Sequence, residues 1–130
     1  MAAVACTNQI AQAFENGMEF FSSFGGNPVS CEVGLAVLDV IDQEGLQQHA
    51  FEMGEYILNQ WRELKGEFDC IGDVRGIGLF LGIEFVKDSL TKEPDASRAH
   101  QIVQTLKERG FLLSTDGPYH NVIKLSLIHI

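Results

Sequence analysis

Hydrophobic and polar positions follow a helical period through the first half of the chain. This spacing predicts helices over residues 9–16, 28–42 and 46–65. The second of these segments is apolar on nearly every side, so we expect most of its surface to be buried. In the third segment, one apolar stripe is expected to face inward: Leu46, Ala50, Met53, Ile57, Trp61 and Leu64.

The period changes in the second half of the chain. Residues 71–86 alternate between apolar and mixed positions, which predicts one strand with a buried face and a partly covered face. Further elements are expected along the chain: a helix over residues 95–109, strands at 111–114 and 122–125, and a short buried strand at residues 1–6. The predicted fold class is α+β, with helices packed on a small, mainly antiparallel sheet.

A loop rich in small residues precedes the second predicted helix. Asn27 is suited to N-capping and Pro28 to the first helical position. Just before them come two serines and two glycines: Ser22, Ser23, Gly25 and Gly26. Hydroxyls, backbone amides and the positive end of a helix dipole together predict an anion site, with phosphate as the obvious ligand. The same residues also suit an ordinary capped turn that binds nothing.

Charge and cysteine content exclude several classes of function. The formal net charge of −9 argues against nucleic acid, and the few Lys and Arg residues are too scattered for an anionic membrane surface. Cys6, Cys31 and Cys70 are far apart and odd in number, which predicts reduced thiols without a disulfide framework or a zinc site. The four histidines show no metal-ligand spacing.

Three blocks of the sequence carry a resemblance to a known family. The loop Ser-Ser-Phe-Gly-Gly-Asn-Pro at residues 22–28 resembles the Thr-Phe/Tyr-Gly-Gly-Asn-Pro motif of class III pyridoxal-phosphate (PLP) aminotransferases. It is most similar to the branch with ethanolamine-phosphate phospho-lyase and 5-phosphohydroxy-lysine phospho-lyase. Residues 72–80 and 112–118 fit the same branch. The resemblance extends from Met1 to about Leu125.

The resemblance implies a division of the chain into parts of a fold-type-I PLP enzyme. Residues 1–42 are expected to form the end of the PLP-binding large domain, with the phosphate-contact loop and the start of a connecting helix. Residues 43–125 are expected to form the C-terminal small domain, and residues 126–130 a non-native tail. The lysine that forms the Schiff base with PLP is expected upstream of Met1. The chain by itself is therefore expected to be inactive, and no catalytic residue is assigned within it.

The resemblance also implies cofactor and substrate contacts. In the family, the hydroxyl residue before the aromatic-Gly-Gly reaches the PLP phosphate of the other subunit of a homodimer. Ser23 matches that residue, and Ser22, Gly25 and Gly26 complete the expected cofactor-binding set. Lys124 lies where many class III transaminases have an arginine that binds the substrate α-carboxylate, so it is the expected substrate-binding residue. A solvated strand residue remains the alternative for this lysine.

Arg75 has two interpretations. It could bind a substrate carboxylate or phosphate in a bidentate manner. It could instead bridge structural elements, and this is the interpretation that we favour, since fixed donors also serve architecture.

The implied activity is that of a PLP-dependent phospho-lyase. Such an enzyme eliminates phosphate from a phosphorylated amine such as phosphoethanolamine and gives ammonia and an aldehyde. The alternative within the family is a class III transaminase, and the alternative from another class is a non-catalytic anion-binding or interaction module. The expected location is the mitochondrial matrix or the cytoplasm, with no nucleic acid, metal or membrane as partner.

Overall fold

The computed structural model describes residues 3–19 and 21–126. Its contacts divide the chain into two compact units, which meet in the sequence between Glu44 and Gly45. Gly45 has a φ of +61°, a left-handed conformation that glycine adopts without strain.

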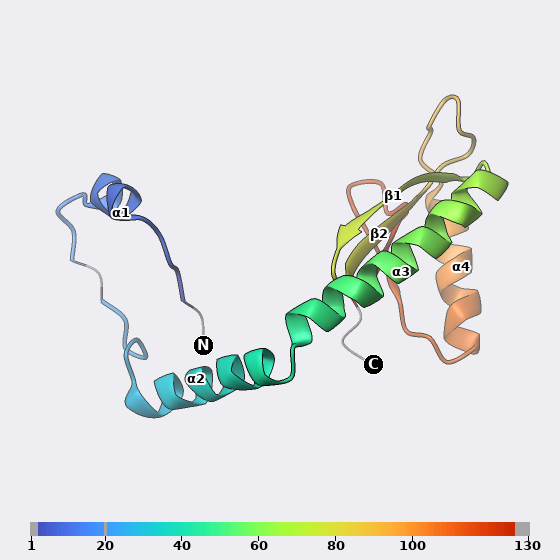
Figure 1. Cartoon of the computed structure of the whole chain (residues 1–130). Helices are drawn as coiled ribbons and strands as arrows, with labels where there is room; N and C mark the ends of the chain where they lie inside the picture. Colours follow the sequence, from blue (N-terminus) through green and yellow to red (C-terminus); the bar gives the residue numbers. More distant parts are fainter. Residues whose placement is uncertain (1–2, 20, 127–130) are drawn as a thin grey trace. The chain divides into compact units, whose positions relative to one another are not determined.

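The N-terminal unit contains two helices, both begun by side-chain caps. Helix α1 spans Asn8–Phe14, and the Thr7 hydroxyl accepts a hydrogen bond from the amide of Ile10. Helix α2 spans Pro28–Gln43 (Figure 1). The Asn27 side chain accepts from the Ser30 amide at 3.1 Å, so the capping residue and the first helical proline are confirmed.

One expectation for the N-terminal unit is wrong, and the burial expected for α2 is not provided within this chain. Residues 3–6 of the predicted buried strand are exposed and irregular, while Met1 and Ala2 lie outside the described residues. A strand needs a neighbour for its backbone hydrogen bonds, and the described part of this unit contains no other strand. Helix α2 buries none of its residues within the chain, and Val29 is 73% exposed. The apolar composition of a helix predicts that it packs against another surface, but it does not provide that surface.

The C-terminal unit packs two helices against a four-stranded sheet, which confirms the predicted class. Its elements are helices α3 (Leu46–Glu67) and α4 (Ala96–Glu108) and strands β1 (Ile71–Ile77), β2 (Phe80–Phe85), β3 (Ser114–Asp116) and β4 (Val122–Ser126). The strand order is β1-β2-β4-β3, and every neighbouring pair is antiparallel. Helix α3 lies along the β1–β2 side of the sheet, and α4 contacts β2, β3 and β4 (Figure 1).

The predicted single strand over residues 71–86 is a β-hairpin. Gly78 has a φ of +53° and reverses the chain, so that Ile77 pairs with Phe80. The alternation within β2 is confirmed, because Leu81, Ile83 and Phe85 are buried. One long strand and two strands joined by a two-residue turn show the same alternation of apolar residues. The two structures differ only at the turn.

The strand expected at residues 111–114 begins later, at Ser114. Gly110 has a φ of +89°, and the Phe111 amide donates to the Leu106 carbonyl at 2.9 Å. This bond belongs to the C-terminal cap of α4 and is therefore not available for strand pairing. Phe111 and Leu112 consequently remain exposed.

The core lies between the helices and one face of the sheet. Leu58 of α3 is only 1% exposed and packs with buried residues of β2, β4 and α4. It was not part of the predicted inward stripe, whose end residues Leu46 and Leu64 remain more than one third exposed. The buried side of α3 is centred near Gly54 and Leu58, because the missing side chain of Gly54 admits the turn of the hairpin.

Candidate functional site

The predicted phosphate loop is exposed and partly bonded to itself. The Gly25 amide donates to the Ser22 hydroxyl at 3.0 Å and to the Ser22 carbonyl at 3.3 Å. Gly26 has a φ of +70°, which explains why a glycine is needed there. Among the described residues, the Ser23 hydroxyl makes no hydrogen bond. Ser23 and Gly26 therefore remain open to a ligand, while the Gly25 amide is already used.

The chemistry of this loop fits a phosphate group. A serine hydroxyl that accepts one hydrogen bond still has a proton to donate, so Ser22 can contribute as well as Ser23. The loop leads into the N-terminus of α2, a 16-residue helix whose dipole favours negative charge. Its amides are not all free, since the Ser30 and Cys31 amides donate to the Asn27 side chain and carbonyl.

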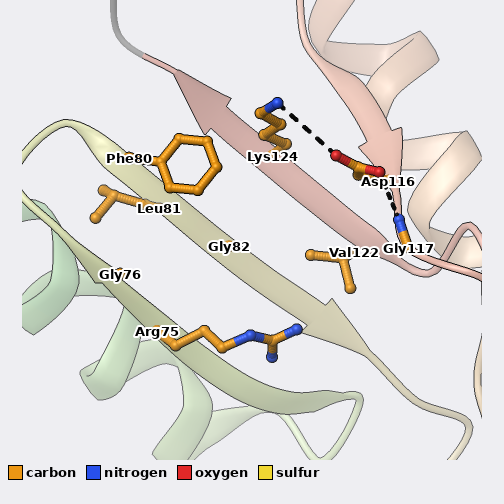
Figure 2. Close-up of a pocket in the computed structure, with 9 residues that line it drawn as sticks. All are labelled: Arg75, Gly76, Phe80, Leu81, Gly82, Asp116, Gly117, Val122 and Lys124. Atoms are coloured by element: carbon orange, nitrogen blue, oxygen red, sulfur yellow. Dashed lines mark hydrogen bonds and ion pairs between the residues drawn. The ribbon is translucent and has the colours of Figure 1, made fainter. Parts of the chain in front are cut away.

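A pocket of about 410 Å³ lies on the sheet of the C-terminal unit and contains Lys124 (Figure 2). Strand register places its residues in rows. Arg75 pairs with Gly82, Gly82 with Lys124, and Lys124 with Ser114. Two residues further along the strands, the next row on the same face is Asp73, Glu84, Val122 and Asp116. A row with two cations therefore lies beside a row with three carboxylates.

Arg75 holds the two hairpin strands together. Its Nη1 atom donates to Asp73 Oδ2 at 2.7 Å and to Glu84 Oε2 at 2.8 Å. These hydrogen bonds raise the pKa of Arg75. Partial burial raises the pKa of Asp73, but hydrogen bonds from Arg75 and the Val74 amide and the nearby positive charges outweigh it and lower that pKa. The bridging interpretation of Arg75 is thereby favoured, since both carboxylates neutralise its charge.

Lys124 is less firmly held than Arg75. Its Nζ lies 3.8 Å from Asp116 Oδ2 and 5.1 Å from the centroid of the Phe80 ring. Asp116 is itself fixed, because its Oδ1 accepts from the Gly117 amide at 2.7 Å. The Lys124 side chain is 37% exposed. An anion entering the pocket can therefore reach its ammonium group directly.

Sequence reasoning found Lys124 but did not place Gly82 or Asp116 in the same pocket. Phe80 and Gly82 lie on the face of β2 opposite the buried residues, in agreement with the predicted alternation. Pairing across strands depends on register, which the pattern of one strand does not contain. His120 has a φ of +52° in the loop before β4, a left-handed conformation that the sequence did not indicate.

Other chemistry is limited in the part of the chain that the structure describes. No three His, Cys, Asp or Glu side chains there come together as a metal site would require. Cys6 and Cys31 are exposed and Cys70 is half-buried. None of the described helices combines the length and apolar character needed to cross a membrane.

Curated proteins from a fly and a nematode are similar to this chain in sequence. The chain is 52% identical over 125 residues to an alanine–glyoxylate aminotransferase 2-like protein of Drosophila melanogaster, covering 95% of this chain and 25% of that protein. It is 41% identical over 126 residues to the ethanolamine-phosphate phospho-lyase homolog 1 of Caenorhabditis elegans, covering 96% and 27%. The chain spans about a quarter of the length of these curated relatives.

Structural comparison gives the same result. The chain is similar to a solved phospholyase from Arthrobacter in complex with phosphoethanolamine, with a TM-score of 0.79 and 36% identity. The match covers 92% of this chain and 28% of that one. Residues 1–129 match the model of the aminotransferase class-III family. The chain therefore belongs to the class III aminotransferase family.

Proposed function

We propose that this chain is part of a PLP-dependent phospho-lyase. The reaction consumes water and a phosphorylated amine such as phosphoethanolamine, and it releases phosphate, ammonia and an aldehyde. The observation that carries this proposal is Lys124 in an open pocket, in a chain similar to a phospholyase that binds phosphoethanolamine. The similarity to an aminotransferase 2-like protein keeps a transaminase as the alternative.

The cofactor proposal assigns the phosphate of PLP to the loop before α2. The Ser23 hydroxyl is the first proposed donor, with the Ser22 hydroxyl and the Gly26 backbone beside it. Gly25, whose amide is bonded to Ser22, is proposed to shape the loop around the phosphate. The exposed Ser22 and Ser23 and the left-handed Gly26 support this assignment. When bound, PLP supplies an electron-withdrawing ring that stabilises negative charge on the substrate carbon next to the amine. The loop residues hold and orient the group.

The substrate proposal assigns the phosphate of the substrate to Lys124. An ammonium group is a point charge without the planar fork that matches a carboxylate. Phosphoethanolamine carries a phosphate and no carboxylate, so a lysine suits it better than it suits an amino acid. The gap of 3.8 Å between Lys124 and Asp116 leaves the ammonium able to accept a new partner.

The remaining proposals concern assembly and location. A homodimer in which Ser23 contacts the cofactor of the partner subunit is proposed from the family resemblance, as is a location in the mitochondrial matrix or the cytoplasm. None of the lysines in this chain is proposed as the Schiff-base residue. The Lys65 and Lys87 side chains, for example, are 42% and 55% exposed, whereas an activated amine is desolvated.

Turnover by the complete enzyme that contains this sequence tests the proposal. Phosphate release from phosphoethanolamine, with PLP and without a keto acid, is the expected result. Strict dependence on a keto acid with no phosphate release would support the transaminase instead. PLP-independent binding without any turnover would support the non-catalytic module.

A further inference from the structure

Gly82 is the position that keeps the sheet pocket open. It lies between Arg75 and Lys124 in one row, and Figure 2 shows their side chains on opposite sides of it. A Cβ atom at residue 82 would lie 3.3 Å from Val122 Cγ1 and 3.9 Å from Arg75 Cγ. Neighbouring strands are only about 4.8 Å apart. Any side chain at this position would therefore occupy the pocket itself.

The two cations of the row are not equivalent. Arg75 is neutralised by Asp73 and Glu84 at hydrogen-bond distance. Among residues 3–19 and 21–126, Lys124 has one carboxylate neighbour, at the longer distance of 3.8 Å. Lys124 is therefore the group that an incoming anion meets, and Arg75 acts as a wall of the pocket.

The surface around Gly82 suits a short carbon chain. Phe80 and Val122 line the pocket on either side of Gly82 along the strands (Figure 2). A ligand with phosphate at Lys124 would pass its carbon atoms over the bare backbone of Gly82, between these two apolar side chains. Burial of these CH₂ groups favours binding, and a methyl group at residue 82 would block that path.

We propose that Gly82 is a specificity-determining residue, which admits the carbon chain of a phosphorylated amine whose phosphate contacts Lys124. This inference rests on the proposed function, because it extends the substrate assignment of Lys124. It predicts that a side chain at residue 82 discriminates between ligands by length. Inorganic phosphate needs only the Lys124 end of the pocket, whereas phosphoethanolamine also needs the space above Gly82.

Ligand titrations of the full 130-residue chain, followed by NMR, test this inference. Gly82→Ala is expected to weaken phosphoethanolamine at least tenfold and inorganic phosphate less than threefold. Lys124→Gln is expected to weaken both ligands at least tenfold. Lys107→Gln, which removes the same charge from the exposed surface of α4, is the matched control and is expected to change neither.

A second variant guards against misfolding. Gly82→Ala with Val122→Ala removes the 3.3 Å contact, so it restores room for folding while the methyl group still fills the space above residue 82. Compared with Val122→Ala alone, which removes part of the same apolar wall, it is expected to show the same length-dependent loss. Equal affinities of wild type and both Gly82 variants, or equal losses for the two ligands, would overturn the inference. Because binding is measured apart from turnover, a complete enzyme that releases no phosphate would contradict the lyase reaction alone.

Discussion

Gly54 of α3 contacts the backbone of Gly78 in the hairpin turn so closely that a methyl group at residue 54 would overlap the Gly78 carbonyl oxygen. The contact lets the hairpin turn approach the helix and brings Leu58, one turn further along α3, into the core. A glycine inside a helix costs about 0.5–1 kcal/mol relative to alanine, so close packing must offset that cost here.

The first prediction concerns this contact. Gly54→Ala is expected to destabilise the chain by about 1–3 kcal/mol, because backbone atoms must move to accept the methyl group. Gly66→Ala is the matched control, since it lies in the same helix with nothing within 4 Å of the new Cβ atom. It is expected to stabilise the chain by up to about 1 kcal/mol. Urea unfolding followed by circular dichroism measures both, and equal effects would refute the close contact.

The second prediction concerns the start of α4. The Asp95 carboxylate accepts from the Arg98 amide at 2.9 Å, and this bond is the largest cause that lowers the pKa of Asp95. Removing the cap by Asp95→Ala is expected to cost about 0.5–2 kcal/mol at pH 7. Denaturant unfolding of the variant, compared with wild type, measures this loss of stability.

Acid should weaken the same cap. Because folding lowers the pKa of Asp95 from about 3.8, its stabilisation is complete above that pH and is lost as the pH falls through the folded value. Asp95→Asn keeps an acceptor oxygen and cannot titrate. Its free energy of unfolding is therefore expected to fall less than that of wild type between pH 7 and pH 2, and an identical decrease would contradict the assignment.

The third prediction concerns the buried Asn121. Its Nδ2 donates to the Phe85 carbonyl at 2.9 Å, and the Phe85 amide donates to the Asn121 carbonyl at 2.8 Å. Asn121→Ala is expected to cost about 1–3 kcal/mol. Asn121→Asp should cost more at pH 7, because it places a carboxylate against a carbonyl oxygen at a site that is 3% exposed. Thermal unfolding compares them with Asn59→Ala, an exposed control expected within about 0.5 kcal/mol of wild type.

The fourth prediction concerns Ser23 in the complete enzyme. Ser23→Ala is expected to weaken PLP binding about tenfold or more, since a hydrogen bond to a charged group contributes about 1.5–3 kcal/mol. Ser23→Thr keeps the hydroxyl and should retain most of the affinity. Dissociation of PLP, followed by its absorbance, measures both variants. Equal affinity of Ser23→Ala and wild type would remove Ser23 from the cofactor site.

The last prediction concerns the lysines of this chain. Mixed with PLP, the 130-residue chain is expected to form no stable Schiff-base absorbance beyond that of exposed amines. Borohydride trapping and peptide mapping test this, since a single lysine labelled in preference to the others would identify an activated amine. That result would overturn the assignment of the Schiff-base residue to another part of the enzyme.

Much of the secondary structure of this protein could be predicted from the sequence, because it depends on residues that are close together in the chain. The caps Thr7, Asn27 and Asp95 and the helices after them depend on residues within one turn of the chain, so they could be predicted. The alternation of residues that buries Ile83 is equally local. The three motif blocks of the sequence indicated the family to which the chain belongs.

The features that depend on contacts between distant residues were decided by the tertiary structure. The hairpin turn at Gly78 divided one predicted strand into two, and the sheet register then aligned Arg75, Gly82 and Lys124 in a row. The burial of Leu58 required the approach that Gly54 permits. Register and close approach are properties of two segments at once, so the hydrophobic pattern of either segment alone does not contain them.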